Sequence, residues 1–256
     1  HDYIDNSDDR FDFYNKKENR IPFDLDYMNK ITKGGLPNKT LNIALAGTGV
    51  GKSLFMCHCA ASNLQLGKNV LYITMEMAEE RIAERIDANL MDYPIQSLGT
   101  LPKNVFTNKI EKIAQASIGK LIVKEYPTGA AHTGHFRALL NELKLKKNFK
   151  PDIIYVDYLN TSESFGLPAT ADLMFALIST EELDELGQIL VKQLKNRYND
   201  PTKYKRFVIG IDRSRMKLYD VEESAQTDIM SDMIPDKPIN NFGDRDSKDT
   251  FAEFKI

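Results

Sequence analysis

The sequence predicts an α/β domain with three layers around a mainly parallel sheet, and three observations lead to this expectation. Apolar runs of strand length alternate with segments of helical periodicity between residues 41 and 158, the pattern of strands covered by helices on both faces. The first run passes directly into a glycine-rich loop and a helix. Two later runs lead into an acid, Glu76 and Asp157.

The composition is that of a globular protein with room for one large domain. The chain has 256 residues, and 42% of them are hydrophobic, which is enough to build a core. No apolar run is long enough to cross a bilayer, and the first residues are acidic rather than basic and apolar. We therefore expect a cytoplasmic protein. Cys57 and Cys59 lie two residues apart in a helical pattern and are expected to be packed thiols.

The chain divides into three parts by composition. Residues 1–20 are polar and charged, and we expect them to form a linker arm without a core of its own. Residues 21–221 hold the main domain, which begins with a short amphipathic piece at 21–37 that is closed by Gly34 and Gly35. From Asp220 to Ile256 there are ten acidic residues against four basic ones, so residues 222–256 are expected to be an acidic, mobile tail.

Residues 41–53 have the pattern of a phosphate-binding loop between a strand and a helix. A triphosphate is wrapped by backbone N–H groups, so glycine is needed where a Cβ would hold the backbone away from the oxygens. The expected nucleotide-binding residues are Gly47, Thr48, Gly49, Val50, Gly51, Lys52 and Ser53. Lys52 would pair with the β- and γ-phosphates, and the Ser53 hydroxyl would coordinate a magnesium ion. Ala46 stands where the pattern has its first glycine.

After this loop the expected elements follow in regular alternation. Helices are predicted at 54–66, 78–90, 103–115 and 135–146, and strands at 69–76, 120–126 and 151–157. Ligands bind at the carboxyl ends of strands in open α/β sheets. Asp157 therefore fits a Walker B acid, which binds waters on the magnesium, and Glu76 is the candidate to orient an attacking water. The alternative for either acid is simple solvation at a strand end.

Beyond Tyr158 the alternation stops. Residues 159–172 lack helical periodicity, although a parallel crossover in such a layer usually needs a helix. We infer that a segment is missing, and we place the gap at the junction of Asn160 and Thr161. Strands are expected at 173–178 and 189–197, with an antiparallel edge pair at 207–211 and 216–221. From Lys192 to Lys217 nine cations face two acids, which is either a solvated face or a basic binding surface.

Taken together, these residues resemble the replicative helicases of T-even-type bacteriophages, a branch of the DnaB-like hexameric helicases with a RecA-type motor core. The resemblance runs from about residue 21 to residue 221. It is carried by residues 31–35, 46–53, 75–77, 156–159, 163–172 and 195–197. Ala46 also occurs in DnaB-like loops, so this departure fits the family.

The resemblance implies ATP as the nucleotide and Mg²⁺ as its metal ion, with Glu76 as catalytic carboxylate. It implies that Lys195 and Arg197 reach into the ATP site of the neighbouring subunit, which makes a homo-hexameric ring part of the mechanism. It further implies 5′ to 3′ travel on single-stranded DNA at the replication fork of an infected bacterium, with a primase and a helicase loader as partners. The family also carries, after residues 156–159, a helix, a sensor strand and DNA-gripping loops that are not readable here.

Two other functions remain open from the sequence. A RecA-like recombinase, which is an ATP-switched filament on DNA, shares the phosphate loop and the Walker B acid. A nucleotide-binding assembly protein without useful turnover would also fit a chain from which a segment is missing.

Overall fold

The computed structural model describes residues 7–15, 18–117, 119–127, 132–158 and 166–230. The strands are β1 (Arg20–Ile21), β2 (Leu36–Pro37), β3 (Asn42–Ala46), β4 (Val70–Thr74), β5 (Leu121–Glu125), β6 (Ile153–Asp157), β7 (Leu173–Ile178), β8 (Gln188–Asn196), β9 (Arg206–Asp212) and β10 (Lys217–Tyr219). The helices are α1 (Ser7–Asn15), α2 (Asp26–Thr32), α3 (Lys52–Gln65), α4 (Glu79–Leu90), the 3-10 helix η1 (Ile95–Thr100), α5 (Lys103–Ala116), α6 (Thr133–Lys147), α7 (Leu167–Thr170), α8 (Glu181–Glu185) and α9 (Glu223–Met230).

A three-stranded parallel sheet, ordered β5-β4-β6, confirms the layered prediction. The side chains of its central strand alternate between two cores. Val70 and Tyr72 pack with α3 and α4, while Leu71 and Ile73 pack with α6 on the other face. Every residue of β4 is buried, as expected for a parallel strand that is covered by helices on both sides.

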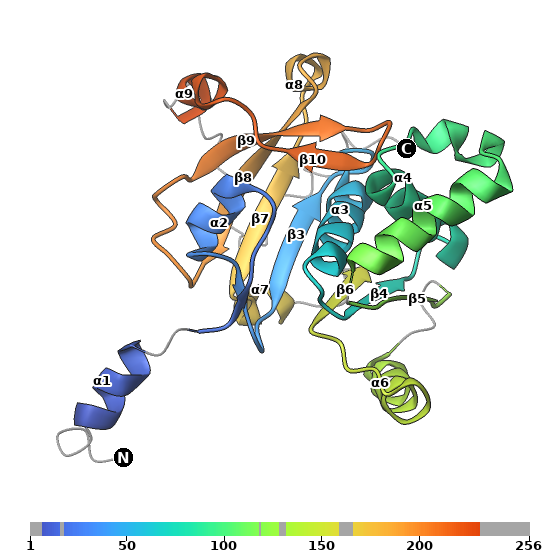
Figure 1. The fold of residues 1–256 in the computed structure, drawn as a ribbon. Helices are drawn as coiled ribbons and strands as arrows, with labels where there is room; N and C mark the ends of the chain where they lie inside the picture. Colours follow the sequence, from blue (N-terminus) through green and yellow to red (C-terminus); the bar gives the residue numbers. More distant parts are fainter. Residues whose placement is uncertain (1–6, 16–17, 118, 128–131, 159–165, 231–256) are drawn as a thin grey trace, which may run out of the picture.

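A five-stranded sheet, ordered β10-β9-β8-β7-β3, holds the predicted antiparallel edge. β3 pairs parallel with β7, and the pairings from β7 to β10 are all antiparallel. Its main core lies between these strands and the helices α2 and α3. Figure 1 shows α2 in front of this sheet and α3 beside β3. Leu25, Met28 and Ile31 are almost fully buried, so the amphipathic piece at 21–37 docks on the domain as predicted.

The two larger sheets end at β3 and β6, which each lack a hydrogen-bonded strand on one side among the described residues. The sequence leads us to expect one sheet, whereas the described residues form two that share α3 as a cover. Ile154 on β6 is 43% exposed, as is typical of an edge strand rather than a central one. Residues 159–165, which include the expected gap between Asn160 and Thr161, lie outside the described residues.

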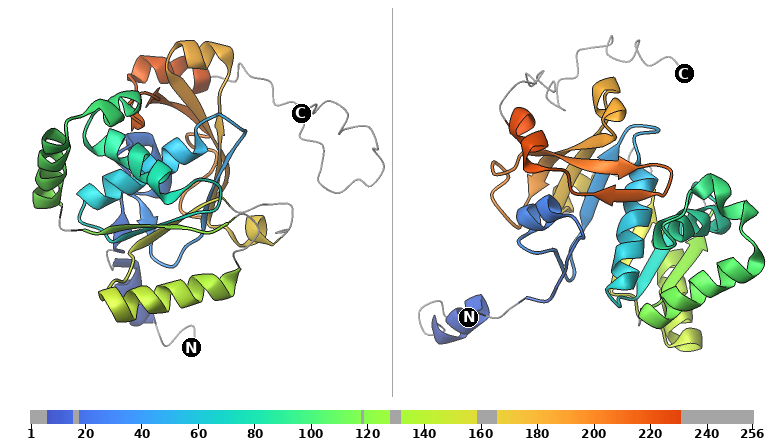
Figure 2. Two further views of the ribbon diagram at one scale, coloured as in Figure 1. Left: turned by 90° about the vertical axis from the view of Figure 1, so that its right-hand side faces the viewer. Right: turned by 45° about the horizontal axis from the view of Figure 1, so that its top comes forward.

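The N-terminal linker contains a helix that the sequence analysis does not predict. α1 projects from the body of the molecule, as Figures 1 and 2 show, and Phe11 on it is 67% exposed. A projecting helix agrees with a linker that has no core of its own. None of the described helices is long and apolar enough to span a bilayer.

The acidic tail differs from the prediction in its first part. Residues 223–230 form α9, which docks on β9 instead of being mobile. The side-chain amide of Gln226 is 1% exposed, accepts a hydrogen bond from the Val208 N–H at 2.9 Å and donates one to the Val208 carbonyl at 2.7 Å. This paired bond satisfies backbone groups that the ladder leaves free. Residues 231–256 lie outside the described residues.

Candidate nucleotide-binding site

The loop between β3 and α3 has the backbone that the glycine pattern predicts. Gly49 and Gly51 adopt φ angles of 77° and 126°, and Gly51 is the N-cap of α3. Residues with a Cβ rarely adopt such angles. A Cβ on Gly51 would also lie 3.3 Å from Cδ1 of Ile211, at the end of β9. The loop therefore requires glycine there because of both its conformation and its close packing against β9.

Lys52 lies between an acid and an aromatic ring. Its Nζ is 3.6 Å from Oδ1 of Asp157 and 3.8 Å from the centre of the Tyr158 ring. The Lys52 side chain is 23% exposed and that of Asp157 only 1%. An ammonium group over a ring face is attracted to its π electrons. The structure thus brings together the loop lysine and the Walker B acid and adds Tyr158, which the sequence analysis does not identify as a site residue.

The two oxygens of Asp157 have different surroundings. Oδ2 accepts a 3.0 Å hydrogen bond from the Tyr72 hydroxyl, which also receives a 3.8 Å contact from Sγ of Cys57. Burial raises the pKa of Tyr72 well above its usual value and that of Cys57 to about 12, so both groups stay protonated and Tyr72 remains a donor. Oδ1 is buried without a hydrogen-bond partner among the described residues, which is unusual for a polar atom.

These groups fit a magnesium ion that arrives with a nucleotide. Mg²⁺ keeps several waters and is commonly bound by one or two protein oxygens together with phosphate. The unpartnered Oδ1 of Asp157 can bind such a water, and Ser53 places a hydroxyl in the first turn of α3. Within the described part of the chain no three His, Cys, Asp or Glu side chains are grouped to hold a metal. An ion at this position would therefore depend on the phosphates.

Glu76 lies at the same sheet edge as Asp157. It is exposed and follows β4 by two residues, and Thr74 at the end of that strand pairs with Asp157 in the register of β6. The turn that carries Glu76 is closed by the Thr74 hydroxyl, which donates to the Met77 carbonyl at 2.8 Å and accepts from the Met77 N–H at 3.1 Å. The side chain of Glu76 can therefore face the same ligand as Asp157.

Lys195 and Arg197 lie at the opposite edge. Lys195 pairs with Met174, which in turn pairs with Ile43 at the beginning of β3, while the loop follows the end of β3. The Lys195 ammonium donates to the carbonyls of Pro168 and Ala169 on α7, at 3.0 and 2.8 Å. Arg197 pairs with Asp172 at 3.2 Å. One chain alone does not bring these two cations to its own loop.

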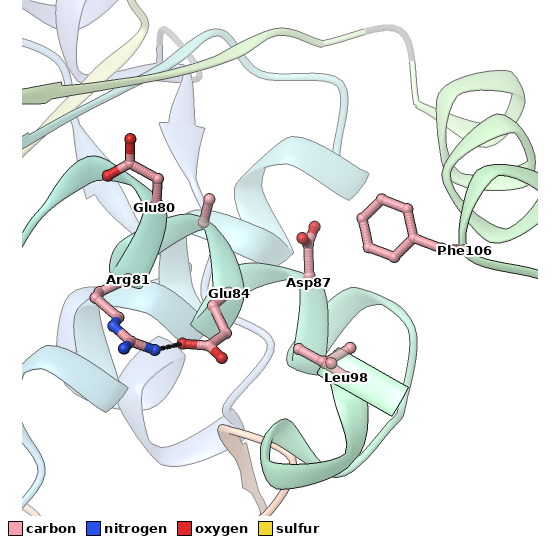
Figure 3. A pocket seen from close by; sticks show the side chains of 8 residues that line it. Glu80, Arg81, Glu84, Asp87, Leu98 and Phe106 are labelled. Atoms are coloured by element: carbon pink, nitrogen blue, oxygen red, sulfur yellow. Dashed lines mark hydrogen bonds and ion pairs between the residues drawn. The ribbon is translucent and has the colours of Figure 1, made fainter. Parts of the chain in front are cut away.

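A surface hollow of about 410 Å³ lies on α4, next to η1 and α5 (Figure 3). None of the loop residues lines it. Its acids are Glu80, Glu84 and Asp87, and Glu84 pairs with Arg81 at 2.9 Å. Burial raises the pKa of Asp87 to about 6. This hollow is distinct from the phosphate loop and lacks the backbone N–H groups that a triphosphate needs.

The family model described as DnaB-like helicase C terminal domain matches residues 21–176. A DnaB-like replicative helicase of Enterobacteria phage T4 is 40% identical over 284 residues, covering 88% of this chain and 60% of the relative. This aligned span is longer than the 256-residue chain, so the relative has residues without a counterpart here. The DNA repair protein RadA of Rickettsia conorii is 31% identical over 132 residues, covering 48% of this chain and 30% of that protein.

Two solved structures share the fold. The first is an ATPase domain with a TM-score of 0.59 and 12% identity, and the match covers 87% of this chain and all of that one. A DnaB-like replicative helicase, solved in a study of its interactions with primase, has a TM-score of 0.57 and 11% identity over 87% of this chain and 69% of its own. At these identities the likeness supports the fold alone, and it agrees with the predicted RecA-like architecture.

Proposed function

Since the chain belongs to the DnaB-like helicase C-terminal domain family, we propose that it is the ATP-hydrolysing motor of a replicative DNA helicase. The observation that carries this proposal is the contact between Lys52 and Asp157 beside the glycine loop. The chain spans about 60% of the length of its T4 relative. Activity, substrate and partners of a whole helicase are therefore part of the proposal.

In this proposal the loop binds ATP and the two acids organise the attack of water. The N–H groups of the loop and the ammonium of Lys52 bind the phosphates, while Ser53 and Asp157 hold a magnesium ion and its waters. When bound, Mg²⁺ would neutralise charge on the β- and γ-phosphates and so favour transfer of the terminal phosphoryl group. Glu76 orients the attacking water from the end of β4 and accepts its proton.

The position of the two distant cations supports an active site that is shared between subunits. Lys195 and Arg197 are at the sheet edge opposite their own loop, so they can reach an ATP only in a neighbouring copy. An arginine in this role stabilises charge on the transferring phosphoryl group, and it is worth about 10³ to 10⁵ in rate. A homo-hexameric ring satisfies this requirement, because each subunit offers a loop on one side and the cation pair on the other.

The ring would travel 5′ to 3′ on single-stranded DNA at a replication fork and displace the other strand. The names of the T4 relative and of the solved DnaB-like helicase support this assignment and suggest a primase as partner. A helicase loader and the cytoplasm of an infected bacterium belong to the same proposal. The DNA-gripping residues are not assigned, because the residues expected to carry them are not among those described.

The test is strand displacement by the uninterrupted protein that carries the segment expected between Asn160 and Thr161. Forked duplexes with a 5′ or a 3′ single-stranded tail are supplied with ATP and magnesium, with and without the loader. We expect unwinding only of the fork with the 5′ tail, and a Lys52→Ala variant should unwind neither. DNA-stimulated ATP turnover without any displacement, even with the loader present, would overturn the proposal.

A RecA-like recombinase is the second candidate, and the similarity of about half the chain to RadA favours keeping it. The two functions predict different assemblies on single-stranded DNA, which electron microscopy separates. Closed rings support the helicase, whereas open filaments support the recombinase. A nucleotide-binding assembly protein without turnover is the third candidate, and it would bind ATP but release no phosphate.

A further inference from the structure

An ion pair outside the predicted site lies directly on the phosphate loop. Arg213 follows the end of β9, and its Nη2 is 2.9 Å from Oδ1 of Asp184 on α8. The same guanidinium donates from Nη1 to the Gly49 carbonyl and from Nη2 to the Val50 carbonyl, both at 3.4 Å. One side chain thus joins an acid, a strand end and two successive peptide units of the loop.

The sheet topology explains why Arg213 reaches the loop within one chain. β9 is antiparallel to β8, which is antiparallel to β7, so β9 runs in the same direction as β7 and β3. The carboxyl end of β9 therefore lies at the edge where β3 enters the loop. The 3.3 Å approach of Ile211 to a Cβ built on Gly51 shows how closely this strand end packs behind the loop.

The contacts of Arg213 determine how the loop peptides are oriented. A trans peptide unit holds its carbonyl and its N–H on opposite sides. When the Val50 carbonyl points to Arg213, the N–H of Gly51 points to the other side, away from β9. The N–H of Val50 is likewise turned away and donates to the Gly47 carbonyl at 3.4 Å. N–H groups presented in this way at the start of a helix are those that bind phosphate oxygens.

We propose that Arg213, held by Asp184, is a positioning residue that keeps the nucleotide loop of its own subunit in the phosphate-binding conformation. This inference deepens the proposed function and rests on it, since it names a residue that acts on the same ATP site. Arg213 differs from Lys195 and Arg197, which are at the opposite edge and are proposed to act on a neighbour. Because the role needs donors to three acceptors at once, the planar guanidinium is suited to it and an ammonium group is not.

The test uses two readouts, of which the first needs no nucleotide. Amide hydrogen exchange of residues 47–53 is measured in the nucleotide-free full chain and in its Arg213→Ala variant. We expect exchange to become about 5- to 10-fold faster in the variant, because two carbonyl contacts are lost. The matched control is Lys146→Ala, which removes an exposed cation from an ion pair on α6 and should leave exchange in the loop unchanged. Unchanged exchange in Arg213→Ala would overturn the inference.

The second readout is the dissociation constant of ATP with magnesium, measured by calorimetry. Arg213→Ala should weaken binding about tenfold and Arg213→Lys about threefold, which matches a loss of partly exposed contacts. Asp184→Asn should also weaken binding about threefold, but it should have no further effect once Arg213 is alanine. Additive effects of the two substitutions would contradict the brace. If the wild-type chain binds no ATP, the proposed function fails while hydrogen exchange still decides the role of Arg213.

Discussion

The Tyr72 hydroxyl donates a 3.0 Å hydrogen bond to Oδ2 of Asp157, and Oδ1 of the same carboxylate faces Lys52 at 3.6 Å. The carboxylate is almost fully buried, so the bond from Tyr72 limits its rotation. One oxygen is therefore used to fix the side chain and the other is left for the ligand. This division between orientation and ligand binding is typical of acids near a metal ion.

Replacing Tyr72 with phenylalanine should lower the rate of ATP turnover more than it weakens ATP binding. The substitution leaves Oδ2 of Asp157 buried without a donor, which costs about 1–3 kcal/mol of stability. We expect kcat to fall about 3- to 30-fold, with a change of less than about threefold in the dissociation constant of ATP. Steady-state ATPase assays, calorimetry and urea unfolding measure the three effects.

The matched control for this prediction is Tyr155→Phe. Tyr155 is on β6, stacks with Tyr72 at 6.0 Å and has its hydroxyl hydrogen-bonded to Asn63 instead of Asp157. It should lose stability to a similar extent while kcat stays unchanged. Equal losses of kcat in both variants would show that general packing, and not the bond to Asp157, is responsible.

Replacing Glu76 with glutamine should abolish turnover and preserve binding. Glutamine keeps the size of the side chain but cannot accept a proton, and removal of a general base usually costs about 10² to 10⁴ in rate. Phosphate release and ATP affinity are to be measured on the same preparation. Glu80→Gln, a change on α4 at the surface hollow, serves as control. Unchanged turnover in the Glu76 variant would remove the role assigned to this residue.

The parts of the site that could be predicted depend on local sequence. A strand, a glycine loop and Gly-Lys-Ser identify the phosphate site because the backbone geometry of such a loop admits few other residues, as the φ of 126° at Gly51 shows. Glu76 and Asp157 could be placed at one edge because both end predicted parallel strands, and the pairing of Thr74 with Asp157 confirms that edge.

The parts that could not be predicted depend on contacts between distant segments. Tyr72 lies in an apolar strand and is indistinguishable there from a core residue, since only the neighbouring strand supplies its partner Asp157. Arg213 was counted within a basic segment, and its position on the loop requires knowing that β9 runs parallel to β3 through two antiparallel pairings. The division into two sheets is likewise invisible in each strand alone. α9 was missed because its buried Gln226 gives no apolar signal.

Asp87 should make the folding stability depend on pH between about 4 and 6. Its pKa is about 6 in the folded chain against a usual value of 3.8, because burial disfavours the charged form. The folded state therefore holds the proton more tightly, so its contribution to stability is complete below pH 4 and is lost as the pH rises through 6. With the partial exposure taken into account, this loss is about 1 kcal/mol.

Asp87→Asn should remove this part of the pH dependence and stabilise the chain above pH 7 by a similar amount. Urea unfolding from pH 4 to pH 8 measures the difference between variant and wild type, so other titrating groups cancel. Asp8→Asn on the exposed surface of α1 is the control and should not alter the slope. Parallel curves for Asp87→Asn and wild type would contradict the raised pKa.

Arg197→Ala should abolish ATP turnover while each subunit still binds ATP, because Arg197 is expected to act on a neighbour. Its loss is expected to cost about 10³-fold in rate or more. The decisive measurement mixes this variant with Lys52→Ala, which retains Arg197 but lacks the loop lysine. A mixed ring contains interfaces in which an intact loop meets an intact Arg197, so turnover should reappear with a maximum near equal proportions. Since Lys195 and Arg197 lie at the edge opposite the loop, no monomer of either variant can explain such recovery. Mixtures that remain inactive although size-exclusion chromatography shows mixed rings would exclude action across the interface.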